Sequence, residues 1–460
     1  MVDVPEADGR PTKEFFVSVL GRDILLIDAI VDLVDNSVDG ARRLRKPEAS
    51  LTDTESFKDL WIKIDADSES FRIRDNCGGI SVNVAEEYAF RFGRPPKALK
   101  GEIPAYATGQ FGVGMKRALF KLGTRFMIES TTKSSRFDVD VDVEKWLDQD
   151  ENDWHFDMTN VKKGKMPKGK IGTDIHVTKL RDIIADDLSD ETVLSELRES
   201  LHERHMLSLH RGLKIELNGS SIKVEPPLML ATKAIKPAYR LLHFNSGKPI
   251  RVELLCGVRD GPSREAGWSV FLNDRMVLSK NTESVTGWGD KDEGRIPRYH
   301  NQYGRFRGYV FMTCSDTSRL PWDTTKTGLD EDQPEYRQVE REMISQMEPV
   351  IRFLDDVAKE TAHLQTYGKE GPLLPALEAK EKTLFEIVAG LPNGGRRKTI
   401  TRPFRRPQRK FVDKPAQNEQ SIQFRRPKDE IATLKKFFDV TTGKAAGEEA
   451  WEFVFEVEDL

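Results

Sequence analysis

Four polar residues recur through one segment near the start of the chain, IDAIVDLVDNSVDGARRL. Asp28, Asp32, Asn36 and Asp39 are spaced four, four and three residues apart, so a helix would place them on one face. Like charges stacked in this way destabilise a helix slightly, and Asn has a low helix propensity. A bound Mg²⁺ would use such a row, because it prefers oxygen ligands and commonly combines one or two from the protein with phosphate oxygens. An ordinary solvated acidic face is the alternative.

Two short turns place polar groups at predicted strand ends. In RIRDNCGGI a strand ends at Asp75 and turns through Gly78 and Gly79. A carboxylate there can accept a hydrogen bond from an exocyclic amine, and the glycines let a flat ring approach the backbone. In KIGTDIHV, Thr173 opens another strand and offers a hydroxyl. Alone, each pattern indicates only a turn.

A glycine-rich segment, ATGQFGVGMKRALF, leads directly into a predicted helix. Its Gly109, Gly112 and Gly114 fit neither the P-loop pattern nor the dinucleotide-binding GxGxxG pattern. The physics is related, since glycine amides and a helix N-terminus form a cradle for an anion. Lys116 and Arg117 add positive charge to it. The segment therefore predicts a phosphate-binding loop.

The elements around these motifs mix helices with antiparallel strands. Apolar periodicity predicts helices over residues 23–44, 112–122, 191–209 and 336–364, and strands over 60–64, 70–74, 125–130, 136–143, 173–178, 250–258, 268–278 and 306–312. Asn218-Gly219 predicts a two-residue hairpin. This mixture favours an α+β fold over a parallel, doubly wound one. HERHM, residues 202–206, lacks the spacing of a zinc-binding HExxH and is interpreted as helix surface.

The four motifs, in this order, resemble those of the GHKL superfamily, the Bergerat-fold ATPases that include gyrase B, ninety-kilodalton heat-shock chaperones, histidine kinases and MutL. DLVDNSVDGA looks like the ExxxN helix of the family and DNCGGI like its DxGxG turn. GQFGVG is similar to the glycine box of the chaperone and MORC branches, and GT to the fourth motif. The resemblance covers roughly residues 15–180 and implies a Bergerat-fold ATPase sandwich that binds ATP with Mg²⁺.

The resemblance also implies a role for individual residues. Asn36 would hold Mg²⁺, Asp75 would bind the adenine amino group, and Gly79 would leave room for the ring. Thr173 would support the adenine contact, and Asp39 would lie near the nucleotide. The phosphates would be wrapped by the glycine loop and the start of its helix, residues Gly109, Gln110, Phe111, Gly112, Val113, Gly114 and Lys116.

Two positions depart from the family pattern. The general base of the family is a Glu four residues before the Asn, and here that position is Asp32. The shorter side chain moves the carboxylate by about 1.5 Å, and a misplacement of roughly 1 Å can cost on the order of a hundredfold in rate. We therefore expect slow ATP hydrolysis, with Asp35 as a weaker base candidate. Cys77 stands where DxGxG has its first glycine.

The region after the four motifs resembles the transducer, a second α+β domain of this superfamily that donates a lysine to the γ-phosphate. GWSVFLNDRMVL looks like its strand–turn–strand, with Asn273 and Arg275 in the turn. YVFMTCSDTSRLPWDTTKTGLD resembles its lysine loop, with Lys326 as the candidate and an ordinary loop lysine as the alternative. The implied mechanism is that ATP orders a lid, residues 86–108, and two N-terminal domains pair until hydrolysis releases them.

The charge distribution divides the rest of the chain. Residues 393–428 hold twelve Lys and Arg against Asp413 and Glu419, a net charge of +10, which leaves −14 elsewhere in a chain of net charge −4. The predicted domains are an ATP-binding domain at 1–184, a transducer-like domain at 185–335, a helical segment at 336–390, a basic linker at 391–420 and a strand–helix–helix module at 421–460. The linker should be mostly unpacked. The basic residues 396–428 are a candidate DNA-binding segment, and a solvated linker of repelling charges is the alternative.

The last module permits two interpretations. SIQFRRP followed by two helices has the order of a ribbon–helix–helix unit, in which Gln423 and Arg425 would face DNA. The acidic final helix disfavours that contact, so a small dimerising hairpin is the preferred interpretation.

Composition bears on where in the cell the protein is expected. No apolar run approaches the roughly 18–20 residues of a membrane span, and the acidic N-terminus predicts no secretory signal. The three scattered cysteines argue against a disulfide framework and favour the cytoplasm.

Together these features predict a cytoplasmic, Mg²⁺- and ATP-dependent GHKL ATPase. We expect a homodimer without a membrane partner that acts on DNA or on a DNA-bound protein. The alternatives are a chaperone-like remodeller of proteins, because GQFGVG is shared with that branch, and a scaffold that binds ATP without hydrolysing it.

Overall fold

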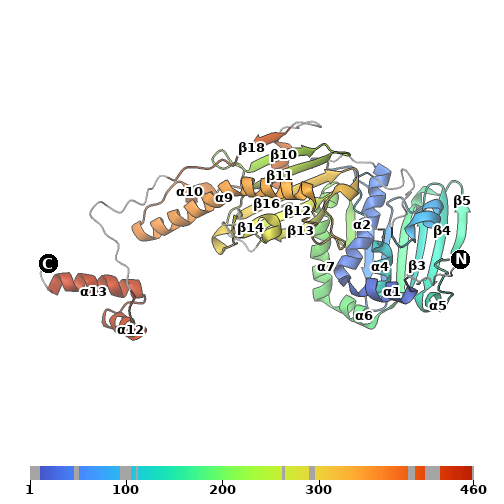
Figure 1. The fold of residues 1–460 in the computed structure, drawn as a ribbon, viewed down its shortest axis with the longest axis horizontal. Coiled ribbons are helices and arrows are strands. Elements are labelled where there is room, and N and C mark those ends of the chain that lie inside the picture. Colours follow the sequence, from blue (N-terminus) through green and yellow to red (C-terminus); the bar gives the residue numbers. More distant parts are fainter. Residues whose placement is uncertain are drawn as a thin grey trace, which may run out of the picture. The chain divides into compact units, whose positions relative to one another are not determined.

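The computed structural model describes residues 11–45, 51–93, 105–109, 112–261, 265–289, 296–391, 399–409 and 425–457. The chain divides into two compact units, Met1–Arg409 and Lys410–Leu460. The predicted α+β class is confirmed, since the first unit combines helices with two large sheets of mixed direction (Figure 1).

The first sheet has the strand order β5-β4-β3-β6-β2-β1-β7-β8 in the described part of the chain. Its strands are β1 (Trp61–Ala66), β2 (Phe71–Asp75), β3 (Gly123–Thr131), β4 (Ser135–Asp142), β5 (Met158–Lys163), β6 (Gly172–Leu180), β7 (Lys214–Leu217) and β8 (Ser220–Ser221). Side chains of β1 and β2 alternate between buried and half-buried, as expected where only one face of a sheet covers a core. The predicted Asn218-Gly219 hairpin joins β7 to β8, with positive φ at both residues.

The first apolar core lies between this sheet and helices on one of its faces (Figure 1). The helices are α1 (Lys13–Arg22), α2 (Leu26–Arg45), α4 (Gly114–Leu122), α5 (Val143–Leu147), α6 (Asp182–Ser189), α7 (Glu191–Arg204) and α8 (Met206–His210), with the short α3 (Val82–Val84) and a π-helical turn at Ala85–Ala89. Leu197, Ile215 and Ile222 belong to the same apolar cluster. We therefore propose that the first domain extends past the expected boundary at residue 184, to about residue 222.

The second sheet has the order β13-β12-β16-β11-β10-β18. Its strands are β10 (Ala238–Phe244), β11 (Ile250–Val258), β12 (Gly267–Leu272), β13 (Arg275–Asn281), β16 (Phe306–Cys314) and β18 (Ile400–Arg402). One face packs against α9 (Pro334–Tyr367) and α10 (Leu373–Leu377), and the other against α8 and α11 (Leu384–Ala389). Every residue of β12 is buried because both faces are covered. Since α9 lies in this core, we propose that the expected helical segment at 336–390 is part of the second domain.

Four further two-residue strands form two short pairs. β9 (Leu228–Met229) pairs with β17 (Lys382–Thr383), and β14 (Trp288–Gly289) with β15 (Ile296–Pro297).

Part of the expected basic linker is folded, which corrects the prediction of an unpacked segment for residues 399–409. β18 pairs with β10, and the Phe404 side chain is buried beside α9. Arg406 forms an ion pair of 2.6 Å with Asp356. Backbone pairing and an aromatic anchor therefore outweigh the repulsion among the arginines. Residues 392–398 and 410–424 lie outside the described residues.

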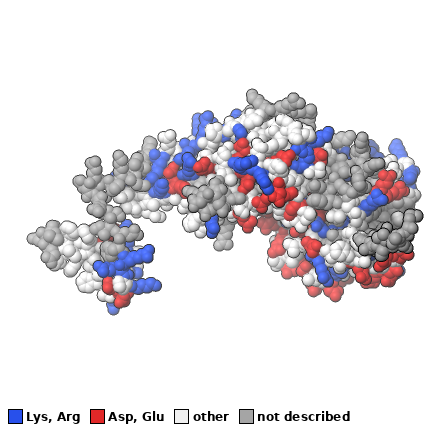
Figure 2. All heavy atoms as spheres, viewed as in Figure 1, with Lys and Arg blue, Asp and Glu red and all other residues white. Residues whose placement is uncertain are grey.

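The second unit contains α12 (Lys428–Phe437) and α13 (Gly443–Val457). The strand expected in SIQFRRP is not formed at Arg425–Pro427, its last three residues. The rest of that segment, including Gln423, lies outside the described residues. Ala446 is buried, whereas Phe437, Trp451 and Val457 expose more than half of their surface. Figure 2 shows basic side chains gathered on this unit and acidic ones along the edge of the first domain near α5 and α6. In the described residues no helix is both long and apolar enough for a membrane crossing.

Candidate functional site

One cavity brings together the three residues expected at the adenine and the residue expected to hold Mg²⁺. Asn36 on α2, Asp75 at the end of β2, Gly79 in the following turn and Thr173 on β6 all line it. The remaining lining residues are Leu33, Ser37, Gly40, Arg43, Ile73, Cys77, Ile80, Met115 and Ile175. Its lining combines apolar side chains with a few convergent polar groups, the composition of a small-molecule site, and its volume in this structure is about 40 Å³.

Gly79 is required by the backbone at this turn. Its φ is +70°, and a Cβ would lie 2.3 Å from the carbonyl oxygen of Thr131. Cys77, the departure from the family pattern, does not have a positive φ, whereas Gly78 and Gly79 do. A side chain is therefore tolerated at position 77, and the thiol is buried.

The Asp75 carboxylate is held in place by three donors. Its Oδ2 accepts from Ser37 Oγ at 2.7 Å, and its Oδ1 accepts from the backbone N–H groups of Cys77 at 2.7 Å and Thr173 at 3.3 Å. Burial raises the pKa of Asp75, and these hydrogen bonds oppose the shift. The carboxylate is thus oriented before any ligand arrives. Ser37 was not among the expected site residues, although its place beside Asn36 on α2 was a usable signal.

The hydroxyl groups of Ser130 and Thr173 support the cavity from the side of β3 and β6. Ser130 Oγ accepts from the Ile80 backbone N–H at 2.7 Å and lies 3.3 Å from Thr173 Oγ1. Arg43 donates to the Gly79 carbonyl at 3.1 Å. These contacts fix the glycine turn against β3 and β6. No pattern in the sequence singled out Ser130, because its partners come from the turn after β2 and from β6.

Asp39 anchors the start of the glycine loop. Its Oδ1 accepts from the Thr108 backbone N–H at 2.9 Å and from the Thr108 hydroxyl at 3.1 Å, and its Oδ2 accepts from the Gly109 N–H at 2.9 Å. Burial raises the pKa of Asp39 despite these bonds. The expected position near the nucleotide is compatible with this geometry, in which Asp39 binds the loop itself.

The rest of the loop leads into α4. Gln110 and Phe111 lie outside the described residues. Gly112 has φ +69°, Val113 is the N-cap and Gly114 begins the helix. The helix N-terminus is therefore placed to bind an anion.

Lys116 braces the loop in this structure. Its ammonium donates to the Ala89 carbonyl at 3.0 Å and also to the Gly112 carbonyl. Burial lowers the pKa of Lys116 to about 7. The side chain therefore links the glycine loop to the end of the π-helical turn at Ala85–Ala89.

Asp32 lies between the loop helix and the second domain. Its Oδ2 accepts from Arg117 at 2.8 Å, and its Oδ1 accepts from Lys326 at 3.1 Å. A Cβ on Gly114 would lie 3.1 Å from Oδ2, so the carboxylate also touches the start of α4. Both oxygens of the expected base are thus occupied by cations.

Lys326 reaches the same place from the second domain. Its ammonium also donates to Asp35 Oδ2 at 2.9 Å, and the whole side chain is buried. Burial opposes its charge, but Asp32 and Asp35 outweigh burial and raise the pKa of Lys326. The residue has φ +60°, a conformation that non-glycine residues adopt at a cost and often at functional sites.

Asp35 is the centre of a buried ionic cluster that no motif in the sequence indicated. Arg275 donates to it at 3.0 Å, and His205 Nε2 lies 3.8 Å away. Burial would raise the pKa of Asp35, but Arg275, Lys326 and His205 lower it well below the usual range. Burial lowers the pKa of His205 to about 3. The interpretation of HERHM as helix surface is wrong for His205, which interrupts the expected single helix between α7 and α8 and turns inward.

The expected turn of the second domain docks onto α2. Asn273 and Asp274, both with positive φ, join β12 to β13. Arg42 donates to the Asn273 carbonyl at 2.8 Å and to Asp274 at 2.7 Å, and Asn273 Nδ2 donates to the Ala107 carbonyl at 3.0 Å. This turn therefore touches both α2 and the end of the expected lid, whose residues 94–104 lie outside the described residues.

The donor set near the cavity also limits how a metal could bind. Among the described residues no cluster of three His, Cys, Asp or Glu side chains could hold an ion. Asp32, Asp35 and Asp39 are already paired with cations or backbone N–H groups, whereas Asn36 lies exposed on the cavity wall. This fits a magnesium ion that takes the Asn36 oxygen and draws its other ligands from phosphate and water.

A comparison with protein families agrees with this geometry. Residues 25–173 match the family model described as histidine kinase-, DNA gyrase B-, and HSP90-like ATPase. The match spans α2, the glycine turn, the loop before α4 and the start of β6. A search of curated proteins finds no match. Residues 25–173 therefore belong to the GHKL superfamily and form an ATP-binding domain of this ATPase family.

Proposed function

We propose that the protein hydrolyses ATP with Mg²⁺ and that Lys326 senses the γ-phosphate. The observation that carries this proposal is the burial of Lys326 between Asp32 and Asp35, beside the start of α4. A loop lysine 291 residues away from Asp35 in sequence reaches the ATP-binding domain only through the packing of the second domain. A compact ammonium in that place suits a phosphate oxygen.

The chemistry assigned to Asp32 follows from its two contacts. When the Lys326 ammonium moves from Asp32 Oδ1 to a phosphate oxygen, Oδ1 becomes free to accept a proton from water. Arg117 meanwhile keeps Asp32 Oδ2 in place. Asn36 would hold the magnesium ion, which supplies charge neutralisation at the phosphates. Because Asp32 is one methylene shorter than Glu, we expect slow turnover.

We further propose that ATP gates the pairing of two chains. The turn of Asn273 and Asp274 contacts Ala107, so an ordered lid and the second domain would move together. Exposed aromatic and aliphatic side chains on α13 of the second unit, Trp451, Phe453, Val454, Phe455 and Val457, favour a homodimer. Equilibrium ultracentrifugation with and without a non-hydrolysable ATP analogue tests this, and a mass that stays monomeric in both would contradict it.

DNA is the partner that the charge distribution favours. The net charge of +10 in residues 393–428 contrasts with the acidic first domain, and phosphate contacts would use it. We propose that this segment contacts DNA directly or beside a DNA-bound protein. The test is the ATPase rate with and without duplex DNA across a salt series. Absence of DNA binding at low salt would leave the chaperone-like remodeller as the better proposal.

Phosphate release from ATP tests hydrolysis itself. Turnover that requires magnesium and Lys326 supports the proposal. ATP binding without release of phosphate, in the parent and in Asp32→Glu alike, would instead support the non-hydrolysing scaffold.

A further inference from the structure

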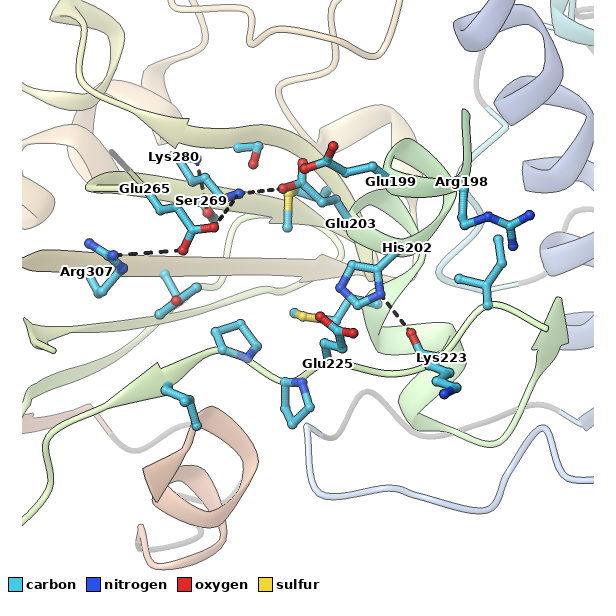
Figure 3. A pocket seen from close by; sticks show the side chains of 18 of the residues that line it. Arg198, Glu199, His202, Glu203, Lys223, Glu225, Glu265, Ser269, Lys280 and Arg307 are labelled. Carbon is cyan, nitrogen blue, oxygen red and sulfur yellow. Dashed lines mark hydrogen bonds and ion pairs between the residues drawn. The ribbon is translucent and has the colours of Figure 1, made fainter. Parts of the chain in front are cut away.

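A second cavity, of about 680 Å³, lies away from the nucleotide cavity. It is bounded by α7, by the connecting segment at residues 221–228 and by β12, β13 and β16 (Figure 3). Small-molecule sites typically have volumes of roughly 300–1,000 Å³. The cavity has the size of a ligand site.

Three cations converge in it on one carboxylate. Glu265 lies 3.5 Å from Arg259 Nη1, 3.5 Å from Lys280 Nζ and 4.0 Å from Arg307 Nη2. Charge-assisted hydrogen bonds are shorter, at about 2.7–2.9 Å. The Glu265 side chain is also half exposed. Lys280 on β13, Arg307 on β16 and Arg259, directly after β11, thus aim cations at the position of the Glu265 carboxylate, at separations longer than those of close charge-assisted hydrogen bonds.

Arg307 is the most constrained of the three cations. Its Nη1 donates to the carbonyl oxygens of Gly304 at 3.1 Å and Phe306 at 2.7 Å, which fixes the plane of the guanidinium. Its Nη2 is buried and makes no hydrogen bond among the described residues, and the residue is 5% exposed. Figure 3 shows this guanidinium directed at Glu265. A buried donor without an acceptor is costly, so an oxyanion here would be bound favourably.

A β-bulge aims the second cation. The register of β12 and β13 shifts opposite Ser269, and Lys280 has φ +51°. The Lys280 backbone N–H donates to Ser269 Oγ at 3.2 Å, and its ammonium also pairs with Glu203 of α7 at 2.8 Å. Bulges often redirect a side chain beside a functional site. Lys280 therefore faces the cavity as a result of built-in backbone geometry.

The lining also offers apolar surface beside further carboxylates. Its apolar members are Met206, Ile222, Pro226, Pro227, Leu228 and Met276, and its other acidic members are Glu199, Glu203 and Glu225. His202 Nδ1 lies 2.8 Å from the Lys223 carbonyl oxygen and must donate to it. A ligand with an apolar body and one anionic group would match the apolar surface and the three cations.

We propose that this cavity binds a small organic oxyanion, a carboxylate or a phosphate monoester, between Arg259, Lys280 and Arg307. Glu265 occupies the anion position when no ligand is bound. The proposal is independent of ATP hydrolysis, because the nucleotide cavity shares no lining residue with this one.

The test uses the full chain and three probes of one shape: benzoate, phenyl phosphate and the neutral benzyl alcohol. Saturation-transfer NMR and calorimetry should detect at least one of the anions and not the alcohol. Binding of benzoate alone would assign a carboxylate ligand, and binding of phenyl phosphate alone a phosphate ester.

Glu265→Gln should tighten binding about tenfold by removing the internal competitor, a gain that misfolding cannot produce. Arg307→Met should weaken it about tenfold, and the exposed Arg337→Met is the matched control.

Three results would overturn the proposal. These are no binding of either anion at about 10 mM, equal binding of benzyl alcohol, and unchanged affinity in Glu265→Gln. Phenyl phosphate binding that survives Arg307→Met belongs to the glycine loop and also counts against it.

Discussion

Lys326 Nζ lies 2.9 Å from Asp35 Oδ2 and 3.1 Å from Asp32 Oδ1, and all three side chains are buried. The lysine comes from the second domain and the carboxylates from α2. An ammonium has three hydrogens to donate, so a new bond to a phosphate oxygen would compete with these two. The contact therefore links the nucleotide site to the packing of the two domains.

Lys326→Met should lower kcat for ATP hydrolysis on the order of a hundredfold, because it removes a charge that stabilises the transition state. ATP affinity should change much less. Phosphate release and calorimetry measure the two effects. The exposed Lys248→Met in the same domain is the control and should leave both unchanged.

Lys326→Arg separates chemistry from folding. Arginine keeps the positive charge against Asp32 and Asp35 but presents a planar fork instead of a point charge. We expect a stable protein with reduced kcat. Parental kcat in Lys326→Met would remove Lys326 from the mechanism.

Asp32→Glu should raise kcat by roughly tenfold or more, because the longer side chain restores the reach that the base position requires. Asp32→Asn should abolish turnover, since an amide cannot accept the proton. Single-turnover phosphate release measures both. Equal rates in the parent and in Asp32→Asn would show that another group is the base.

Asp39→Ala should loosen the glycine loop. The change removes the acceptor for Thr108 and for the Gly109 N–H, at a cost of about 1–3 kcal/mol in the free energy of unfolding. ATP affinity should fall with it. Chemical denaturation and calorimetry measure these effects, and the exposed Glu144→Ala on α5 is the control. Unchanged affinity would mean that the loop is positioned by other contacts.

His205 should make stability depend on pH. Its pKa is lowered to about 3 in the folded protein by burial, so the folded state stays neutral while the unfolded state gains a proton below about pH 6.5. The contribution of His205 to the free energy of unfolding is therefore complete above about pH 6.5 and is lost as the pH falls toward 3. Between pH 6 and pH 5 the parent should lose up to about 1.4 kcal/mol more than His205→Gln.

Denaturant titrations at each pH check the His205 prediction by comparing slopes. His155→Gln is the control, because that side chain is 91% exposed. If the free energy of unfolding of His205→Gln falls with pH as steeply as that of the parent, other groups carry the pH dependence.

That Asn36, Asp75 and Gly79 share one cavity could be predicted from the sequence because the motifs that carry them are local. Asp75 and Gly79 belong to one turn, and Asn36 to one helix, so residue type and spacing already express their geometry. Ser130 was missed because its hydroxyl meets Thr173 only through strand pairing.

The cluster around Asp35 could not be predicted in this way. Arg275 is 240 residues distant in sequence and Lys326 is 291, so their pairing depends on how two separate sheets pack. β18 was missed for a similar reason, since three residues in a basic stretch show no alternation and are ordered by β10 and Phe404.

We propose that Asp75 accepts a hydrogen bond from the amino group of a bound adenine. Calorimetry of the parent protein with Mg-ATP and with Mg-inosine triphosphate, which lacks that amino group, tests it without any substitution. We predict exothermic binding of ATP and binding of the inosine nucleotide at least roughly a hundredfold weaker, because Asp75 would lose its partner. No heat with ATP, or equal affinity for the two nucleotides, would contradict the account.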